Sequence, residues 1–133
     1  MILLRCGNKG REKPAALDKN GKIRDLSTIV KDFDPENINF KTLNKLKKIN
    51  LEIMPEISES TRIGSCINKP KKFIGIGLNY SDHAAEIGAK IPKEPIIFMK
   101  ATSCISGPND DVIIPKNSKK CDWEVEIAFV IGK

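Results

Sequence analysis

Short apolar runs alternate with polar stretches rich in glycine, proline and lysine along the chain. Residues 1–7 predict a first strand, and two further runs flank Asn20 and Gly21, a dipeptide typical of the turn of a β-hairpin. Residues 40–49 instead repeat apolar side chains at every third position, which predicts an amphipathic helix. We therefore expect residues 1–70 to form a small N-terminal α+β domain.

The sequence also predicts local structure in two stretches that connect the longer elements. Ser27 is suited to cap a short helix through Val30 and Phe33, because a serine side chain can accept a hydrogen bond from the first helical turn. Residues 107–111 predict a turn with solvated aspartates, and residues 112–115 predict a short strand.

The pattern changes near residues 68–72, where a polar sequence breaks both periodicities and predicts the start of a second domain, residues 71–133. Residues 73–78 then predict a buried strand that contains a Gly-x-Gly pair, and residues 96–100 predict another strand. The third glycine of the dinucleotide-binding fingerprint does not follow this pair, which excludes a nucleotide site of that kind.

The last stretch, Asp122–Lys133, combines aromatic and β-branched residues with two carboxylates and predicts a β-strand. Glu124 and Glu126 would project from one face of it, with Cα atoms about 6.6 Å apart. Such a pair can converge on one cation, or it can be the solvated face of a strand. Because the residues after Glu126 are apolar on both faces, we expect a buried strand, and a buried acidic pair needs a cation or hydrogen-bond donors.

A short helix is predicted to begin near Ser81, and it would place His83 and Glu86 three residues apart on one face. Such a pair suits general acid–base chemistry, and the alternative is an ordinary polar pair on the surface. Lys100 ends an apolar strand, where it can mark the edge of a site or lie at the surface with its stem buried.

Composition narrows the class of protein. With 133 residues, 40% of them apolar and 30% charged, the chain is typical of a globular protein. No apolar run approaches the roughly 20 residues that span a bilayer, and residues 1–7 lack the pattern of a secretory signal, so we expect a cytoplasmic protein. Four cysteines without metal-site spacing and a single histidine predict reduced thiols rather than a zinc site.

Lysine and arginine outnumber the acidic residues by 23 to 17, which gives a net charge of +6. The lysines cluster at residues 45–48, 69–72 and 116–120. These clusters lack the aromatic and arginine residues with which nucleic-acid-binding proteins stack on bases or read them. A basic nucleic-acid-binding module is therefore a disfavoured alternative, and we expect solvated lysine faces that can attract an anionic substrate.

From Thr61 onward, the order of these features resembles the fumarylacetoacetate hydrolase family. The resemblance is carried by Arg62-Ile63-Gly64, residues 73–83, residues 95–100, Gly107-Pro108 and residues 122–126. The likeness is closest to bacterial 2-hydroxyhepta-2,4-diene-1,7-dioate isomerases, ureidoglycolate lyases or diketo-deoxy-sugar-acid hydrolases. Residues 3–26 also resemble the small N-terminal domain that these members carry.

The resemblance implies a β-rich α+β protein, in which the small N-terminal domain is followed by the first part of a mixed β-roll. It implies that Glu124 and Glu126 bind Mg²⁺ or Mn²⁺ together with a later aspartate. The metal would polarise a 2-oxo (diketo or enol) carboxylic acid and stabilise an enolate, an intermediate that hydrolase, lyase and isomerase members share.

The resemblance also implies roles for four other residues. His83 and Glu86 would lie on a lid helix and activate water or move a proton, and Tyr80 and Lys100 would contact the substrate. Full-length members usually form homodimers, and neither nucleic acid nor a membrane is an expected partner.

The chain departs from the family pattern at its end. The family's aspartate ligand lies some tens of residues beyond the Glu-x-Glu strand, whereas this sequence ends at Lys133. We therefore expect an incomplete cation site that lacks its third carboxylate, in a truncated or split reading frame. Whether the chain is an enzyme is left open, because an inactive remnant and one half of a split enzyme are both alternatives.

Overall fold

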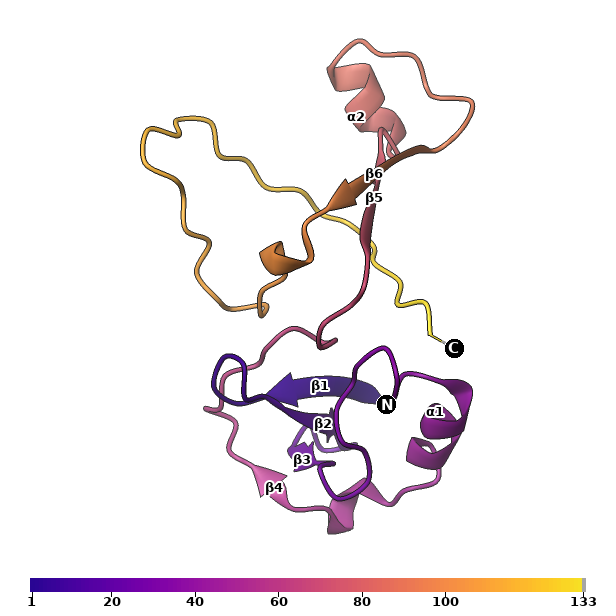
Figure 1. Ribbon diagram of the computed structural model, residues 1–133, viewed down its shortest axis with the longest axis vertical. Helices are drawn as coiled ribbons and strands as arrows, with labels where there is room; N and C mark the ends of the chain where they lie inside the picture. Colours follow the sequence, from indigo (N-terminus) through magenta and orange to yellow (C-terminus); the bar gives the residue numbers. More distant parts are fainter. Residues whose placement is uncertain (133) are drawn as a thin grey trace. The chain divides into compact units, whose positions relative to one another are not determined.

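The computed structural model describes residues 1–132, which fall into two compact units (Figure 1). Unit 1 comprises Met1–Asn68 together with the chain from Ser106 onward, and unit 2 comprises Lys69–Ile105. These units are groups of residues in contact, and the domain division into residues 1–70 and 71–133 stays a prediction. The secondary structure as a whole is of the strand-rich α+β class.

Unit 1 contains a four-stranded antiparallel sheet in the order β1-β2-β3-β4. Its strands are β1 (Ile2–Cys6), β2 (Lys13–Leu17), β3 (Ile23–Asp25) and β4 (Glu56–Ile57). The predicted first strand and hairpin are confirmed. Within the hairpin turn, Asp18 Oδ1 accepts the N–H groups of Asn20 and Lys22 at 2.8 and 3.0 Å. Gly21 adopts a φ of +79°, which glycine reaches without steric cost.

The helical part of unit 1 is smaller than the sequence predicts. Helix α1 (Phe40–Leu46) begins after Asn39, whose side chain accepts the N–H of Thr42 at 2.9 Å, and it ends before the predicted limit at residue 49. It is followed by the 3-10 helix η1 (Leu51–Ile53).

The predicted helix from Ser27 to Phe33 is wrong, because this segment forms only turns. The Asp25 carboxylate accepts the N–H of Ser27 at 2.7 Å, and the Asp32 carboxylate accepts the N–H of Phe33 at 2.8 Å. Such local bonds from aspartate side chains offer the backbone an alternative to helical hydrogen bonding.

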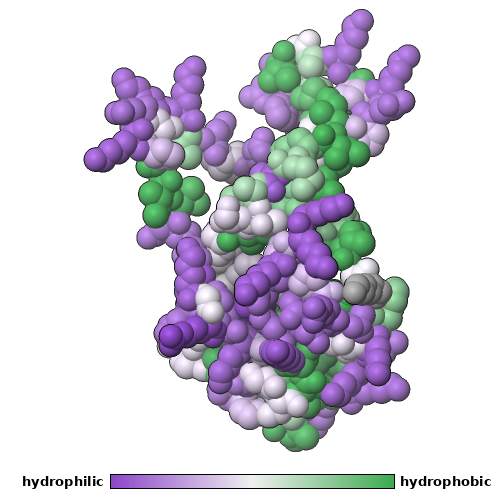
Figure 2. Space-filling model, in the orientation of Figure 1, coloured by the Kyte–Doolittle hydropathy of each residue, from purple (hydrophilic) through white to green (hydrophobic). Residues whose placement is uncertain are grey.

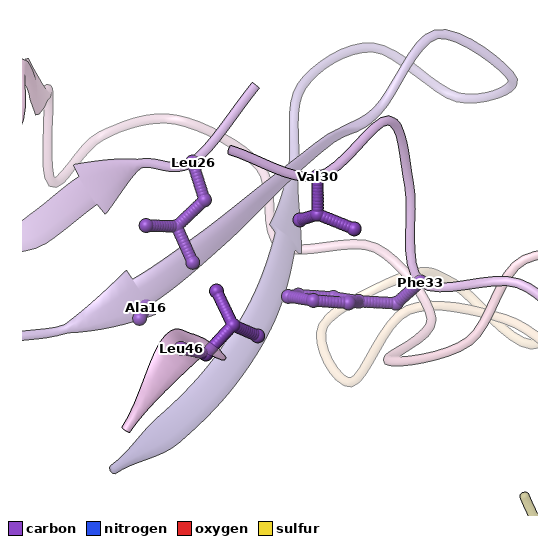
Figure 3. Packing of buried hydrophobic residues seen from close by; sticks show 5 residues of the cluster. All are labelled: Ala16, Leu26, Val30, Phe33 and Leu46. Carbon is purple, nitrogen blue, oxygen red and sulfur yellow. The ribbon is translucent and has the colours of Figure 1, made fainter. Parts of the chain in front are cut away.

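The main core of unit 1 lies between the sheet, the turns after β3 and α1. Figure 3 shows Phe33 and Leu46 pointing toward one another, with Val30, Leu26 and Ala16 around them. All five are buried, and Phe33 and Leu26 are among the largest fully buried side chains of the chain. The residues that the sequence places in a short helix therefore do form core, but from a turn.

Arg62 ties the turn at residues 107–110 to the N-terminal part of unit 1. Its Nε and Nη2 donate to the two carboxylate oxygens of Asp110, both at 2.6 Å, and its Nη1 donates to Glu12 Oε1 at 2.9 Å. A bidentate arginine–carboxylate pair is the strong, geometrically specific form of ion pair. The prediction that Asp110 is solvated is therefore wrong, because Arg62, remote in sequence, approaches it.

Gly107 lets this turn pack closely. A Cβ atom at this position would clash with the backbone carbonyl oxygen of Ile63, so a side chain has no room here. The Gly107 N–H also donates to Asp110 Oδ2 at 2.8 Å. The hydrogen bonds from Arg62 and from Gly107 together lower the pKa of Asp110 from 3.8 to about 2.

The lowered pKa of Asp110 gives a testable pH dependence. Because the folded-state pKa lies below the unfolded value, the stabilisation is fully present above pH 4 and is lost as the pH falls toward 2. We expect Asp110→Asn to lower the urea midpoint at pH 6 and to have little effect at pH 2. Asp111→Asn, a neighbouring exposed aspartate, is the matched control. Equal effects of Asp110→Asn at both pH values would contradict this assignment.

Unit 2 is built on a two-stranded antiparallel hairpin. It contains β5 (Phe73–Gly77), α2 (Ser81–Glu86), β6 (Ile96–Lys100) and the 3-10 helix η2 (Thr102–Cys104). The two predicted strands and the predicted helix near Ser81 are present. The expectation that residues 73–78 form a buried strand is wrong, because Ile74 and Ile76 of β5 are 50% and 40% exposed. Ala84 is the buried residue of α2, and Gly88 follows the helix with a φ of +67°.

The chain beyond Gly107 differs from the prediction. Residues 112–115 and 122–132 contain no strand in the structure, and residue 133 of the predicted closing strand lies outside the described residues. A strand is stabilised by hydrogen bonds to a neighbouring strand and by a face that it buries. No strand within residues 1–132 pairs with these segments.

Candidate metal and acid–base residues

The acidic pair Glu124 and Glu126 belongs to unit 1, on the segment that lacks a strand. Both glutamates are exposed, and the side chains of Trp123 and Val125 beside them are 79% and 73% exposed. The expectation of a buried closing strand is therefore wrong for the described residues. Without burial, the pair does not require a cation to offset desolvation, and water can hydrate both carboxylates.

The chemistry of the pair suits a hard divalent cation, but the number of ligands does not. Carboxylate oxygens are the ligands that Mg²⁺ prefers in proteins, usually beside water and substrate oxygens. Within residues 1–132, no three or more histidine, cysteine, aspartate or glutamate side chains gather in a way that could hold a metal ion. Within residues 1–132, the two predicted carboxylates therefore do not gather with a third possible ligand.

The predicted acid–base residues share one short helix of unit 2. His83 lies in the first turn of α2 and Glu86 is its last residue, and both are exposed. The carboxylate of Asp82 accepts the backbone N–H of His83 at 2.8 Å. This hydrogen bond involves the backbone of the histidine and not its imidazole ring. The surface location leaves both chemical alternatives open, an accessible acid–base pair and a solvated polar pair.

Tyr80 and Lys100 lie in different parts of unit 2. Tyr80 is the N-cap residue of α2 and is 37% exposed, so it stands directly before His83 and Glu86. Lys100 pairs with Phe73 at the start of β5, whereas α2 follows the end of β5. Lys100 lies four residues along β6 from Ile96, at the other end of the hairpin. At about 3.3 Å per residue, the two ends of the hairpin are about 13 Å apart. Figure 1 shows α2 at that other end, so the structure does not group Lys100 with the helix.

The ammonium group of Lys100 has an interaction that the sequence does not reveal. Its Nζ lies 5.5 Å from the centroid of the Phe73 ring, within the range of a cation–π contact. The pairing of these residues across the hairpin produces this contact. It supports the alternative that Lys100 is a surface lysine at a strand end.

Sequence reasoning missed the polar network around Arg62. Besides Asp110, this arginine contacts Glu12, which also lies 3.5 Å from Arg5. Arg5 is buried and donates to both carboxylate oxygens of Asp32 at 2.7 and 3.0 Å. The one sequence signal that could have pointed to this network is the position of Arg5 inside the otherwise apolar run of residues 2–6, because a buried charge requires a partner.

Comparison with known proteins finds a family similarity in residues 72–133 and relatives that align with nearly the whole chain. Residues 72–133 match the family described as fumarylacetoacetate (FAA) hydrolase, C-terminal. A protein of Burkholderia ambifaria named "Putative hydrolase" is 53% identical over 132 residues, which are 99% of this chain and 47% of that protein. Similarly named proteins of Burkholderia lata and Burkholderia multivorans are each 52% identical, with the same two coverages.

The chain spans about half the length of the curated relatives that it matches. No helix within residues 1–132 has the length and apolar character to cross a membrane. The matched region contains β5, α2 and β6 and the residues of both candidate pairs, His83 with Glu86 and Glu124 with Glu126. Over residues 72–133, this chain is therefore similar to the C-terminal domain of fumarylacetoacetate hydrolases.

Proposed function

We propose that the chain is part of a divalent-metal-dependent hydrolase, lyase or isomerase that acts on a 2-oxo carboxylic acid in its diketo or enol form. The observation that carries this proposal is the family match over residues 72–133, which includes a Glu-x-Glu pair and a His-x-x-Glu pair. The names of the Burkholderia relatives, which give a hydrolase without a substrate, agree with the class of reaction. The same proposal includes the fold of residues 71–133, which would form the first part of a mixed β-roll.

The proposed role of Glu124 and Glu126 is to supply two oxygen ligands to Mg²⁺ or Mn²⁺. When bound, such a cation supplies Lewis acidity toward a keto oxygen. No third ligand gathers with the pair within residues 1–132. Polypeptide equivalent to the unmatched part of the relatives is the proposed source of a third carboxylate. For this reason we assign no step of the reaction to the metal.

The proposed role of His83 and Glu86 is proton transfer. A neutral imidazole can take a proton from water or from the carbon next to a carbonyl group, and a carboxylate one helical turn away can orient the ring. Exposure of both residues on α2 leaves them accessible to a substrate. Tyr80, directly before the helix, is the nearer of the two proposed substrate contacts, and Lys100 is the more remote one along the hairpin.

The substitution His83→Ala tests whether His83 and Glu86 transfer protons while Glu124 and Glu126 bind the cation. The assay uses a chimaera in which this chain replaces the matched part of the Burkholderia ambifaria relative, because the chain spans 47% of that protein. We expect turnover of a 2,4-dioxo acid to fall by about 10²-fold or more, because general acid–base catalysis contributes roughly that much. The affinity for Mn²⁺, measured by calorimetry, should stay the same.

Ser81→Ala, at an exposed position of the same helix, is the matched control and should change neither quantity. Loss of Mn²⁺ affinity in the His83→Ala chimaera would show that the histidine has been given the wrong role. Unchanged turnover would leave His83 and Glu86 as a surface polar pair.

A further inference from the structure

One face of the β5–β6 hairpin carries four large apolar side chains that protein atoms cover only in part. Directly opposite residues of an antiparallel pair project to the same side, and the register pairs Ile74 with Met99 and Ile76 with Ile97. Their exposed fractions are 50%, 62%, 40% and 67% in that order. We call these four residues the hairpin face. Figure 2 shows apolar residues at the surface in the region where Figure 1 draws β5 and β6.

The opposite side of the hairpin is partly covered by its own residues. The ring of Phe98 occupies the space over Gly75, where a Cβ atom would come within 2.5 Å of Phe98 Cζ. Lys100 lies over the ring of Phe73 on the same side. The two sides of the hairpin thus differ. On the side of Gly75, the Phe98 ring fills the space where a side chain is missing, whereas the hairpin face is open to solvent.

The hairpin also has open edges. Within residues 1–132, β5 pairs with β6 alone, and β6 pairs with β5 alone. Each strand therefore has an outer row of backbone N–H and C=O groups that no other strand satisfies, and an isolated two-stranded hairpin is marginally stable in water. An apolar face next to an unpaired edge is the surface on which a further strand or sheet adds.

The relatives indicate which polypeptide could cover this surface. At 53% identity over 132 residues, the Burkholderia ambifaria protein shares the fold of the matched part, and more than half of its length has no counterpart in this chain. A second copy of this chain is a poorer occupant, because each copy carries a net charge of +6 and two copies repel.

We propose that the hairpin face and the adjoining strand edge are the docking surface for a polypeptide equivalent to the unmatched part of these relatives. The inference rests on the similarity to these relatives and on the exposed side chains, and it does not depend on the proposed reaction. It makes the hairpin of unit 2 the place where two halves of one catalytic fold meet.

The test mixes the full chain with the unmatched part of the Burkholderia ambifaria relative, produced as a separate polypeptide by co-expression. We expect a 1:1 complex in analytical ultracentrifugation, and we expect Ile97→Asp to weaken it at least tenfold. The matched control is Ile53→Asp, which places the same change on η1, where Ile53 is 73% exposed and lies outside the hairpin. Absence of a complex, dimers of the chain alone, or equal weakening by both variants would overturn the proposal.

A second measurement does not require the separate polypeptide to fold. Met99 and Met1 are 62% and 59% exposed, so hydrogen peroxide should oxidise both at similar rates in the chain alone. In the chimaera that joins this chain to the unmatched part of the relative, we expect Met99 to be oxidised at least fivefold more slowly than Met1. Equal rates for the two methionines in the chimaera would contradict docking on the hairpin face.

Discussion

Replacement of Phe33 by alanine is expected to lower the free energy of unfolding of unit 1 by about 3 to 5 kcal/mol. The ring is 2% exposed and packs among Leu26, Val30 and Leu46, so its removal loses buried apolar surface and leaves a cavity. For a small unit with a stability of roughly 5 kcal/mol or somewhat more, a loss of this size leaves it close to unfolding. Urea denaturation followed by circular dichroism measures the change.

The chain offers a matched control for this substitution. Phe40, at the start of α1, is 77% exposed, so Phe40→Ala removes the same side chain without creating a cavity. We expect it to change the stability by less than about 0.5 kcal/mol. Similar losses for the two variants would show that Phe33 does not occupy the core that Figure 3 displays.

Replacement of Glu124 by alanine is expected to remove the metal-dependent activity of the chimaera. If Glu124 and Glu126 are two of three carboxylate ligands, one deletion leaves too few oxygens to hold a hard cation at physiological concentration. We expect at least a 10²-fold loss of kcat/KM toward a 2,4-dioxo acid, measured by the decay of its enol absorbance. Excess Mn²⁺ should restore part of the activity.

Glu59→Ala is the control for this second prediction, because Glu59 is another exposed glutamate of unit 1. It removes one negative charge without touching the Glu-x-Glu pair, so the activity should stay at the level of the parent. Retention of activity by the Glu124 variant would remove the pair from the metal site.

The elements that sequence patterns predict well are those stabilised by near neighbours in the chain. The β2–β3 hairpin depends on Asp18 and Gly21 within its own turn, and both signals are visible in the sequence. Helix α1 begins at Phe40 because the side chain of Asn39 caps it, which again is local chemistry. Strands β5 and β6 have apolar runs and lie close enough in sequence to pair with each other.

One error is local, because hydrogen bonds from the Asp25 and Asp32 carboxylates replace the predicted helix at residues 27–33 with turns. The other errors concern features that depend on distant partners. The pattern of residues 122–132 is typical of a strand, but a strand forms only beside another one, and none within residues 1–132 pairs with it. The charge state and contacts of Asp110 depend on Arg62, 48 positions away in the chain, which no local pattern reveals. The roles of the candidate site residues follow from motif order alone and stay predictions.

We propose that Glu124 and Glu126 form part of a divalent-cation site that polypeptide outside residues 1–132 completes. Calorimetric titration with Mn²⁺ tests it most directly, with the chain and the chimaera compared side by side. We predict millimolar affinity for the chain alone, micromolar affinity for the chimaera, and loss of the latter in the Glu124→Ala chimaera. Micromolar binding by the chain alone, or micromolar binding by the chimaera without Glu124, would contradict the claim.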